Sequence, residues 1–70
     1  MVNYGTVLRI EALQGFGFIR DDSQQDWFFV RDGVRDPGFE ALWIGERVGF
    51  SKGWTRSGPV AVDIHHEQLD

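Results

Sequence analysis

Two aromatic-rich runs carry the clearest chemical signal in this 70-residue chain. The first reads QGFGFI over residues 14–19, and the second reads DWFFV over residues 26–30. A fold of this length has one small interior, which cannot hold every one of these rings. Some rings must therefore face water, and exposed rings on a sheet are the surface on which unpaired bases stack. The two runs predict stacking chemistry.

Other arrangements of reactive residues are weaker. Asp21 and Asp22 are interpreted as part of a solvated loop rather than as a carboxylate pair for acid–base chemistry. The polar residues 63–67 include His65 and His66, but adjacent side chains of a strand point to opposite faces, which suits chelation poorly. No Ser/His/Asp set, Lys-based site or Gly-rich phosphate loop stands out, and the chain has no cysteine. The sequence therefore predicts no enzymatic activity, no metal site and no cofactor.

Composition limits the class of partner. The formal net charge of −4 argues against a nucleic-acid binder driven by phosphate neutralisation, although stacking can still supply affinity. Six of the seven cations are arginine, which stacks on bases, but genome composition is the simpler explanation of that bias. No apolar run approaches the roughly 18 residues of a membrane span, and residues 1–4 lack the features of a signal peptide. The cytoplasm is the expected compartment, with no membrane partner.

The elements that position the two runs read as short strands rather than helices. Strand-like segments occupy about 4–13, 16–20, 27–30, about 47–52 and about 60–65. They are joined by a hairpin loop at 21–25, a long connection at 31–46 with an Asp-Pro-Gly turn, and a last hairpin at 54–59. This order predicts one domain over 1–70, with its core at about 4–66. We expect an all-β fold, a small five-stranded antiparallel β-barrel of the OB type.

Strand parity divides the rings between two faces. Phe16 and Phe18 share one face of their strand, with glycines on the other. Taken alone, this strand favours phenylalanines in the core and glycines outside. On the next strand, Phe28 lies opposite to Trp27 and Phe29. If Phe28 pairs beside Phe16 and Phe18, three rings form one platform, and the inward glycines allow the strand to curve. The predicted core is Val7, Ile10, Ile19, Trp27, Phe29, Val34, Val48, Val62 and Ile64, with small residues expected around Trp27.

These motifs, taken together, resemble the cold-shock domain family. The matching segments are Gly5-Thr6-Val7, the runs at 15–19 and 26–30, Gly38-Phe39, and Gly58-Pro59 followed by Ala61. The resemblance extends from about Gly5 to Ile64. It implies an OB-like barrel that binds single-stranded RNA and DNA, and it implies that Phe16, Phe18, Phe28 and Phe39 stack on bases.

The chain departs from the family pattern around these rings. Arg9 stands where the family has a stacking Trp, Val30 where it has His, and Arg31 where it has Phe. Arginine planes also stack on bases, so Arg9, Arg31 and Arg56 are expected to stack or to contact phosphates. Alternatively, the site is reduced and the barrel does something else. The predicted nucleic-acid site is Arg9, Phe16, Phe18, Phe28, Val30, Arg31, Phe39 and Arg56.

Two classes of partner remain open. The first is single-stranded RNA or DNA, bound with little sequence preference in the manner of an RNA chaperone in cold adaptation or gene regulation, as the family suggests. The second is a protein partner or a second copy, packed against the Phe face, Trp43 and Trp54. A monomer is the default, with a homodimer through the Trp43/Trp54 surface or by strand exchange through the loop 31–46 as the alternative.

Overall fold

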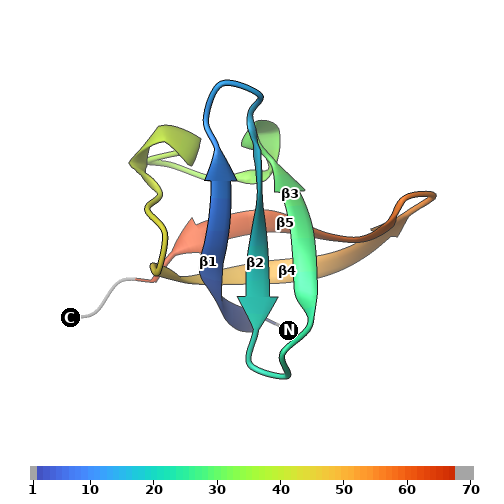
Figure 1. Cartoon of the computed structure of the whole chain (residues 1–70). Coiled ribbons are helices and arrows are strands. Elements are labelled where there is room, and N and C mark those ends of the chain that lie inside the picture. The colour runs from blue at the N-terminus through green and yellow to red at the C-terminus, as the bar shows by residue number, and fades with distance from the viewer. Residues whose placement is uncertain (1, 68–70) are drawn as a thin grey trace.

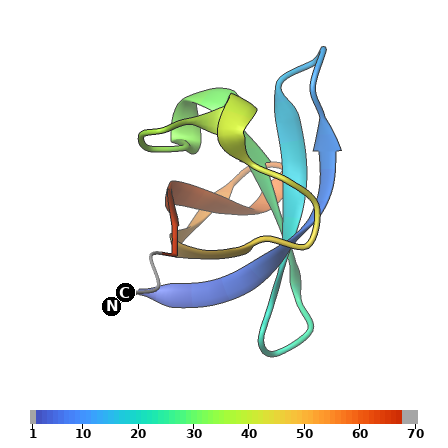
Figure 2. The ribbon, with the colours of Figure 1, turned by 90° about the vertical axis from the view of Figure 1, so that its left-hand side faces the viewer.

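The computed structural model describes residues 2–67 and shows a closed barrel of five strands. The strands are β1 (Asn3–Glu11), β2 (Phe16–Asp21), β3 (Asp26–Val30), β4 (Arg47–Thr55) and β5 (Gly58–His66), joined around the barrel in the order β1-β2-β3-β5-β4. Two short 3-10 helices, η1 (Arg31–Gly33) and η2 (Phe39–Ala41), lie in the long connection. Figures 1 and 2 show these helices at one end of the barrel. Within residues 2–67 no helix is long and apolar enough to cross a membrane.

The predicted five-stranded barrel is confirmed, with one seam that is parallel. β1 pairs antiparallel with β2 and β4, β2 with β3, and β4 with β5. A closed ring with an odd number of strands cannot alternate direction throughout, so two neighbours must run the same way. Those neighbours are β3 and β5, which pair in parallel through Phe28 and Val60.

The last hairpin is longer than the sequence indicates. We expected β4 to end near Lys52 and β5 to begin near Val60, but the ladder continues to Thr55 and Gly58. Gly58 has a φ of +121°, which side-chain-bearing residues rarely adopt, and this allows the tight connection. The end of the hairpin consequently projects from the barrel as a two-stranded arm (Figure 1).

Most of the predicted core is confirmed. Val7, Ile19, Trp27, Phe29, Val48 and Ile64 are buried, and Ile10 and Val34 are partly buried against them. Val62 was expected inside but is 42% exposed. The strict alternation of β5 fails there because the β4–β5 register shifts between Gly49 and Ser51, and Asp63 has a φ of +56°. The barrel instead buries Ala61, together with Phe39, Leu42 and Phe50, which the prediction omitted.

Trp27 is anchored by a buried carboxylate. Its Nε1 donates to an oxygen of Asp21 at 2.8 Å, and the backbone N–H groups of Ser23 and Gln25 also donate to that carboxylate. Asp21 is 5% exposed, so the expectation of a solvated loop is wrong for it. The partners of Trp27 are also not small, because its ring packs against Phe50 and Trp54.

The ionisation of Asp21 follows from these contacts. Burial alone would raise the pKa of its carboxyl group. The hydrogen bonds from Gln25, Trp27 and Ser23, together with the nearby ammonium of Lys52, outweigh that effect and hold the pKa below its ordinary value. Asp21 is therefore a charged side chain that the fold both buries and satisfies.

Gly17 lies on the inner face of β2, as predicted, and the structure shows why a side chain is excluded there. A Cβ at this position would lie 2.6 Å from the Phe29 ring and 2.3 Å from the backbone oxygen of Arg9. The missing side chain therefore makes room for Phe29 and for the close approach of β1. Position 17 is therefore restricted to glycine by the lack of space inside the barrel.

Candidate nucleic-acid interface

Three phenylalanines form one cluster on the outer face of β2 and β3. Phe18 lies directly opposite Phe28 in the β2–β3 ladder, and Phe16 is two residues along β2 from Phe18. The ring centroid of Phe28 lies 5.6 Å from the ring centroids of both Phe16 and Phe18, and those two centroids are 6.3 Å apart. All three side chains are half-buried. We call this cluster the three-ring platform; its arrangement is the one expected if Phe28 pairs beside Phe16 and Phe18, and that pairing is observed.

The β1 side of the platform carries a neutralised arginine. Arg9 lies opposite Phe18 in the β1–β2 ladder, and Glu11 lies opposite Phe16. The guanidinium of Arg9 binds the Glu11 carboxylate at 2.7 Å, and both side chains are exposed. The predicted position of Arg9 beside the rings is thus observed, but its charge is already paired.

The two ends of the platform differ. At one end Val30 lies opposite Phe16 and is 46% exposed, so it adds an apolar surface. At the other end Arg20 lies opposite Asp26, and the two side chains form a bidentate ion pair with N–O distances of 2.8 and 3.2 Å. The hydrogen bond to Asp26 raises the pKa of Arg20. The surface therefore has an apolar centre with a charge-balanced rim.

Phe39 and Arg31 make contacts that the sequence did not predict. Phe39 is 3% exposed and packs inside against Phe29, so in this structure its ring is not available for stacking on a base. Arg31 lies over that ring at 4.7 Å, and it donates to Glu40 at 2.8 Å and to the backbone oxygen of Ala12 at 3.0 Å. Arg31 thus ties the long connection to the β1–β2 turn. The long connection has no periodicity that could have shown this.

The β4–β5 hairpin extends the platform through residues that the predicted site did not include. A hollow of about 290 Å³ is lined by Phe18, Phe28, Ser57, Pro59 and Val60. A neighbouring hollow of about 300 Å³ shares Phe28, Ser57 and Val60 with the first and continues to Val30 and Val62. The exposed Val62 therefore lines this surface. The Gly-Pro pair before the last strand was a signal for the hairpin, but only the β3–β5 pairing places it beside the rings.

The cations of the chain are almost all paired. Arg35 pairs with Asp63, Arg47 with Asp22 and Glu67, and Lys52 with Asp21, in addition to the pairs of Arg9, Arg20 and Arg31. Within the described residues 2–67, Arg56 is the one cation outside an ion pair. It lies exposed in the turn at the end of the arm.

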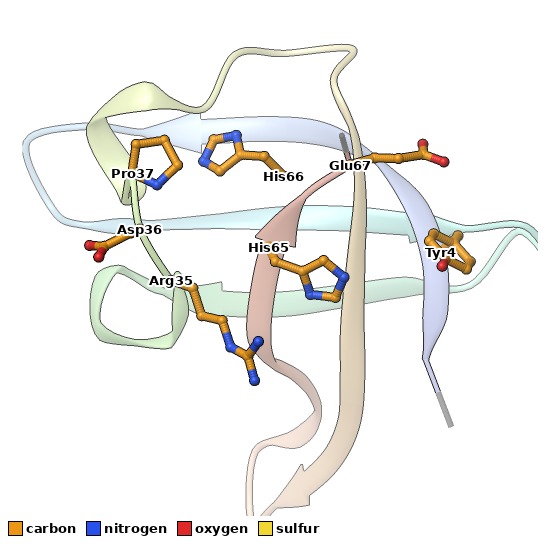
Figure 3. Close-up of a pocket in the computed structure, with 7 residues that line it drawn as sticks. All are labelled: Tyr4, Arg35, Asp36, Pro37, His65, His66 and Glu67. Carbon is orange, nitrogen blue, oxygen red and sulfur yellow. The ribbon is translucent and has the colours of Figure 1, made fainter. Parts of the chain in front are cut away.

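Another hollow, of about 470 Å³, lies on the side of β4 and β5 that faces away from β2 and β3 (Figure 3). Its lining residues are Tyr4, Arg35, Asp36, Pro37, His65, His66 and Glu67. The two histidines were considered above as metal ligands. The Nδ1 of His66 instead forms a hydrogen bond with the buried carboxylate of Glu46, at 2.5 Å. The part of the chain that the structure describes contains no cluster of three or more metal-ligating side chains.

Trp43 and Trp54 are the two exposed indoles, at 61% and 69%. The long connection that carries Trp43 and the arm that carries Trp54 lie on opposite sides of the barrel (Figure 1). They do not form one patch on a single copy, and the homodimer expected through these two indoles stays a prediction.

The chain was compared with known proteins. It is 38% identical over 60 residues to the major cold shock proteins of Streptococcus pyogenes serotype M6 and serotype M1, covering 86% of this chain and 90% of each relative. A solved structure titled drosophila Unr CSD456 matches with a TM-score of 0.80 and 28% identity, covering 97% of this chain and 27% of that one. No family model matches the chain. The chain belongs to the cold-shock protein family, and the predicted resemblance is confirmed.

Proposed function

We propose that this protein binds single-stranded RNA or DNA on the three-ring platform, with little sequence preference, and so keeps strands unpaired. The observation that carries the proposal is the cluster of Phe16, Phe18 and Phe28 at centroid distances of 5.6–6.3 Å on an outer face. Base–aromatic stacking contributes roughly 1–3 kcal/mol per base and tolerates any sequence, because every base has a π-face.

The pairing of charges supports a binding mode that depends on stacking. The arginines beside the rings, Arg9 and Arg20, already bind carboxylates, whereas Arg56 at the end of the arm does not pair within residues 2–67. Each phosphate neutralised on a single strand lowers the log–log slope of affinity against salt by about 0.7. We therefore expect a shallow slope of about −0.7 to −1.4, which corresponds to one or two phosphates.

A titration tests both parts of the proposal. A fluorescently labelled pyrimidine oligonucleotide of about ten nucleotides, within the range of site sizes known for OB folds, is mixed with increasing protein, and anisotropy is recorded at several salt concentrations. Binding with the shallow slope is the expected result. Absence of binding at low salt would overturn the proposal. A slope of about −3 or steeper, equivalent to four or more phosphates, would show that charge rather than stacking drives binding.

The role of the individual arginines can be read from the same titration. Arg56→Gln should reduce the steepness of the salt slope by about one phosphate, or roughly 0.7, because Arg56 has no carboxylate partner within residues 2–67 that it must first release. Arg9→Gln should change the slope less, since Arg9 must first leave Glu11. Equal effects of the two variants would show that the ion pair opens without cost when the strand binds.

A further inference from the structure

Trp54 is a large exposed ring that the three-ring platform does not include. It lies on β4 in the projecting arm, and its indole is 69% exposed. Its ring centroid lies 5.4 Å from that of Trp27 with an interplanar angle of 79°, an edge-to-face contact. Trp27 is fixed in turn by Asp21. The indole of Trp54 is therefore held in place on one side and open to solvent elsewhere, as a stacking surface requires.

The arm connects Trp54 to the platform. Trp54 lies opposite Pro59 in the β4–β5 ladder, and paired residues of neighbouring strands place their side chains on the same face. Pro59 lines the hollow that also contains Phe18 and Phe28. Pro59 therefore borders the platform and also lies opposite Trp54 in the ladder, so it connects the two aromatic sites along the arm.

The charges on the arm fit a polyanion. Arg56 follows two residues after Trp54 in the turn, and it has no carboxylate partner within residues 2–67. On the other side of Trp54, the ammonium of Lys52 lies 5.0 Å from the centre of the Trp27 ring. Lys52 is already paired with Asp21, so Arg56 is the cation beside Trp54 that is open to a phosphate. An exposed aromatic ring next to such a cation is the combination that binds a single strand through its bases and its phosphates.

We infer that Trp54 is an additional base-stacking position, which lengthens the bound single strand from the platform onto the arm. This inference rests on the proposed function and adds the length of strand that the site recognises. A short strand that fills the platform does not reach Trp54, whereas a longer one does. The contribution of Trp54 to affinity therefore depends on the length of the strand.

The experiment compares two lengths of oligothymidine, of about four and about ten nucleotides, which lie within the site sizes known for OB folds. Anisotropy titrations are made with the wild type, Trp54→Ala, Trp54→Phe and Trp43→Ala at one salt concentration. Trp43→Ala is the matched control, because Trp43 is similarly exposed but lies on the opposite side of the barrel. Trp54→Phe keeps a ring at the position and should retain most of the affinity.

Trp54→Ala should weaken binding of the longer strand roughly 5- to 150-fold, the loss of one stacked base, and leave the shorter strand within about twofold, well below that loss. Unchanged affinity for the longer strand, or an equal loss for both lengths, would overturn the inference. If the wild type binds neither strand, the proposed function itself fails. Sedimentation of wild type and Trp54→Ala adds the remaining test, since an association that depends on Trp54 without any effect on strand binding would assign the indole to a contact between copies.

Discussion

β3 carries aromatic rings on both of its faces, and the rings of the two faces differ in their exposure and in their neighbours. Trp27 and Phe29 point into the barrel and are each 1% exposed. Phe28, between them, points outward and joins the rings of Phe16 and Phe18. Neighbours in the sequence therefore belong to two regions, an enclosed core and a half-exposed platform.

The comparison separates stability from binding. A ring enclosed in the barrel contributes through the apolar area removed from water and through close packing. A ring on the platform keeps part of that area open, and this area becomes available to a base. The same substitution should therefore have a different main effect on each face.

The largest expected effect comes from the inner face. Phe29→Ala should lower the free energy of unfolding by about 3–5 kcal/mol, because it leaves a cavity between Gly17 and Phe39. A small domain is only marginally stable, so this variant should be largely unfolded in a urea titration followed by circular dichroism. A loss below about 1 kcal/mol, far less than a core truncation costs, would show that the faces are assigned the wrong way round.

The same space can be tested by filling it. Gly17→Ala places a Cβ 2.6 Å from the Phe29 ring and 2.3 Å from a backbone oxygen. Overpacking of this kind should lower the free energy of unfolding by about 1–3 kcal/mol, measured in the same urea titration. Gly53→Ala is the matched control, because its Cβ would meet its nearest neighbour at 3.4 Å. If both variants are equally stable, the packing around Gly17 is no tighter than the packing around Gly53.

On the outer face, Phe28→Ala should act mainly on binding. Loss of one stacked base predicts a decrease in affinity of about 1–3 kcal/mol for a pyrimidine oligonucleotide. The loss of stability should be less than half of that of Phe29→Ala, since the Phe28 ring is half-buried. Anisotropy and urea unfolding on the two variants give the comparison directly. Normal affinity with a large loss of stability would place Phe28 in the core.

The smallest expected effect is the pH dependence of the carboxylate that anchors Trp27. The pKa of Asp21 in the folded protein is below its ordinary value of about 3.9. A depressed pKa means that the ionised group contributes stability above about pH 4 and that this contribution is lost as the pH falls through the folded value. Urea unfolding should therefore give a lower free energy of unfolding at acidic pH than at neutral pH. This decrease should be smaller in Asp21→Asn than in the wild type.

Asp22 provides the matched control for this measurement. The hydrogen bond from Arg47 lowers the pKa of Asp22 too, but its side chain is exposed. An exposed ion pair contributes little to stability, so Asp22→Asn should retain most of the pH dependence of the wild type. If Asp22→Asn removes as much of the pH dependence of stability as Asp21→Asn does, the buried Asp21 carboxylate is not the main cause of that dependence.

The sequence predicted those features that depend on strand parity. Alternation grouped Phe16 with Phe18 and separated Phe28 from Trp27 and Phe29, and this grouping holds because the β2–β3 ladder has no bulge. Which group faces outward depended on the pairing of Phe28 with Phe18, which only the structure shows. The order of five short strand-like segments predicted the barrel, and alternation within them predicted most of its core. Parity is informative wherever a strand is regular and buried on one side.

Other features depend on contacts between residues far apart in the chain. Phe39 lies in an irregular connection, where no period indicates which side chains turn inward. Val62 lies next to a shift of register in β5, so its parity gave the wrong face. Arg31 is exposed, as its sequence position indicates, and Glu40 and Ala12 also hold it in place. These features required the assembled barrel.

The parallel seam between β3 and β5 has a consequence for the order of folding. β1, β2 and β3 form a meander of neighbours in sequence, whereas pairing Phe28 with Val60 must close a much longer loop. Loop closure of this kind costs more entropy and is slow in folding. In the proposed complex, a nucleic-acid strand that lies across Phe28 and Pro59 contacts both β3 and β5. Bound nucleic acid would therefore hold β3 and β5 together and slow the separation of these two strands.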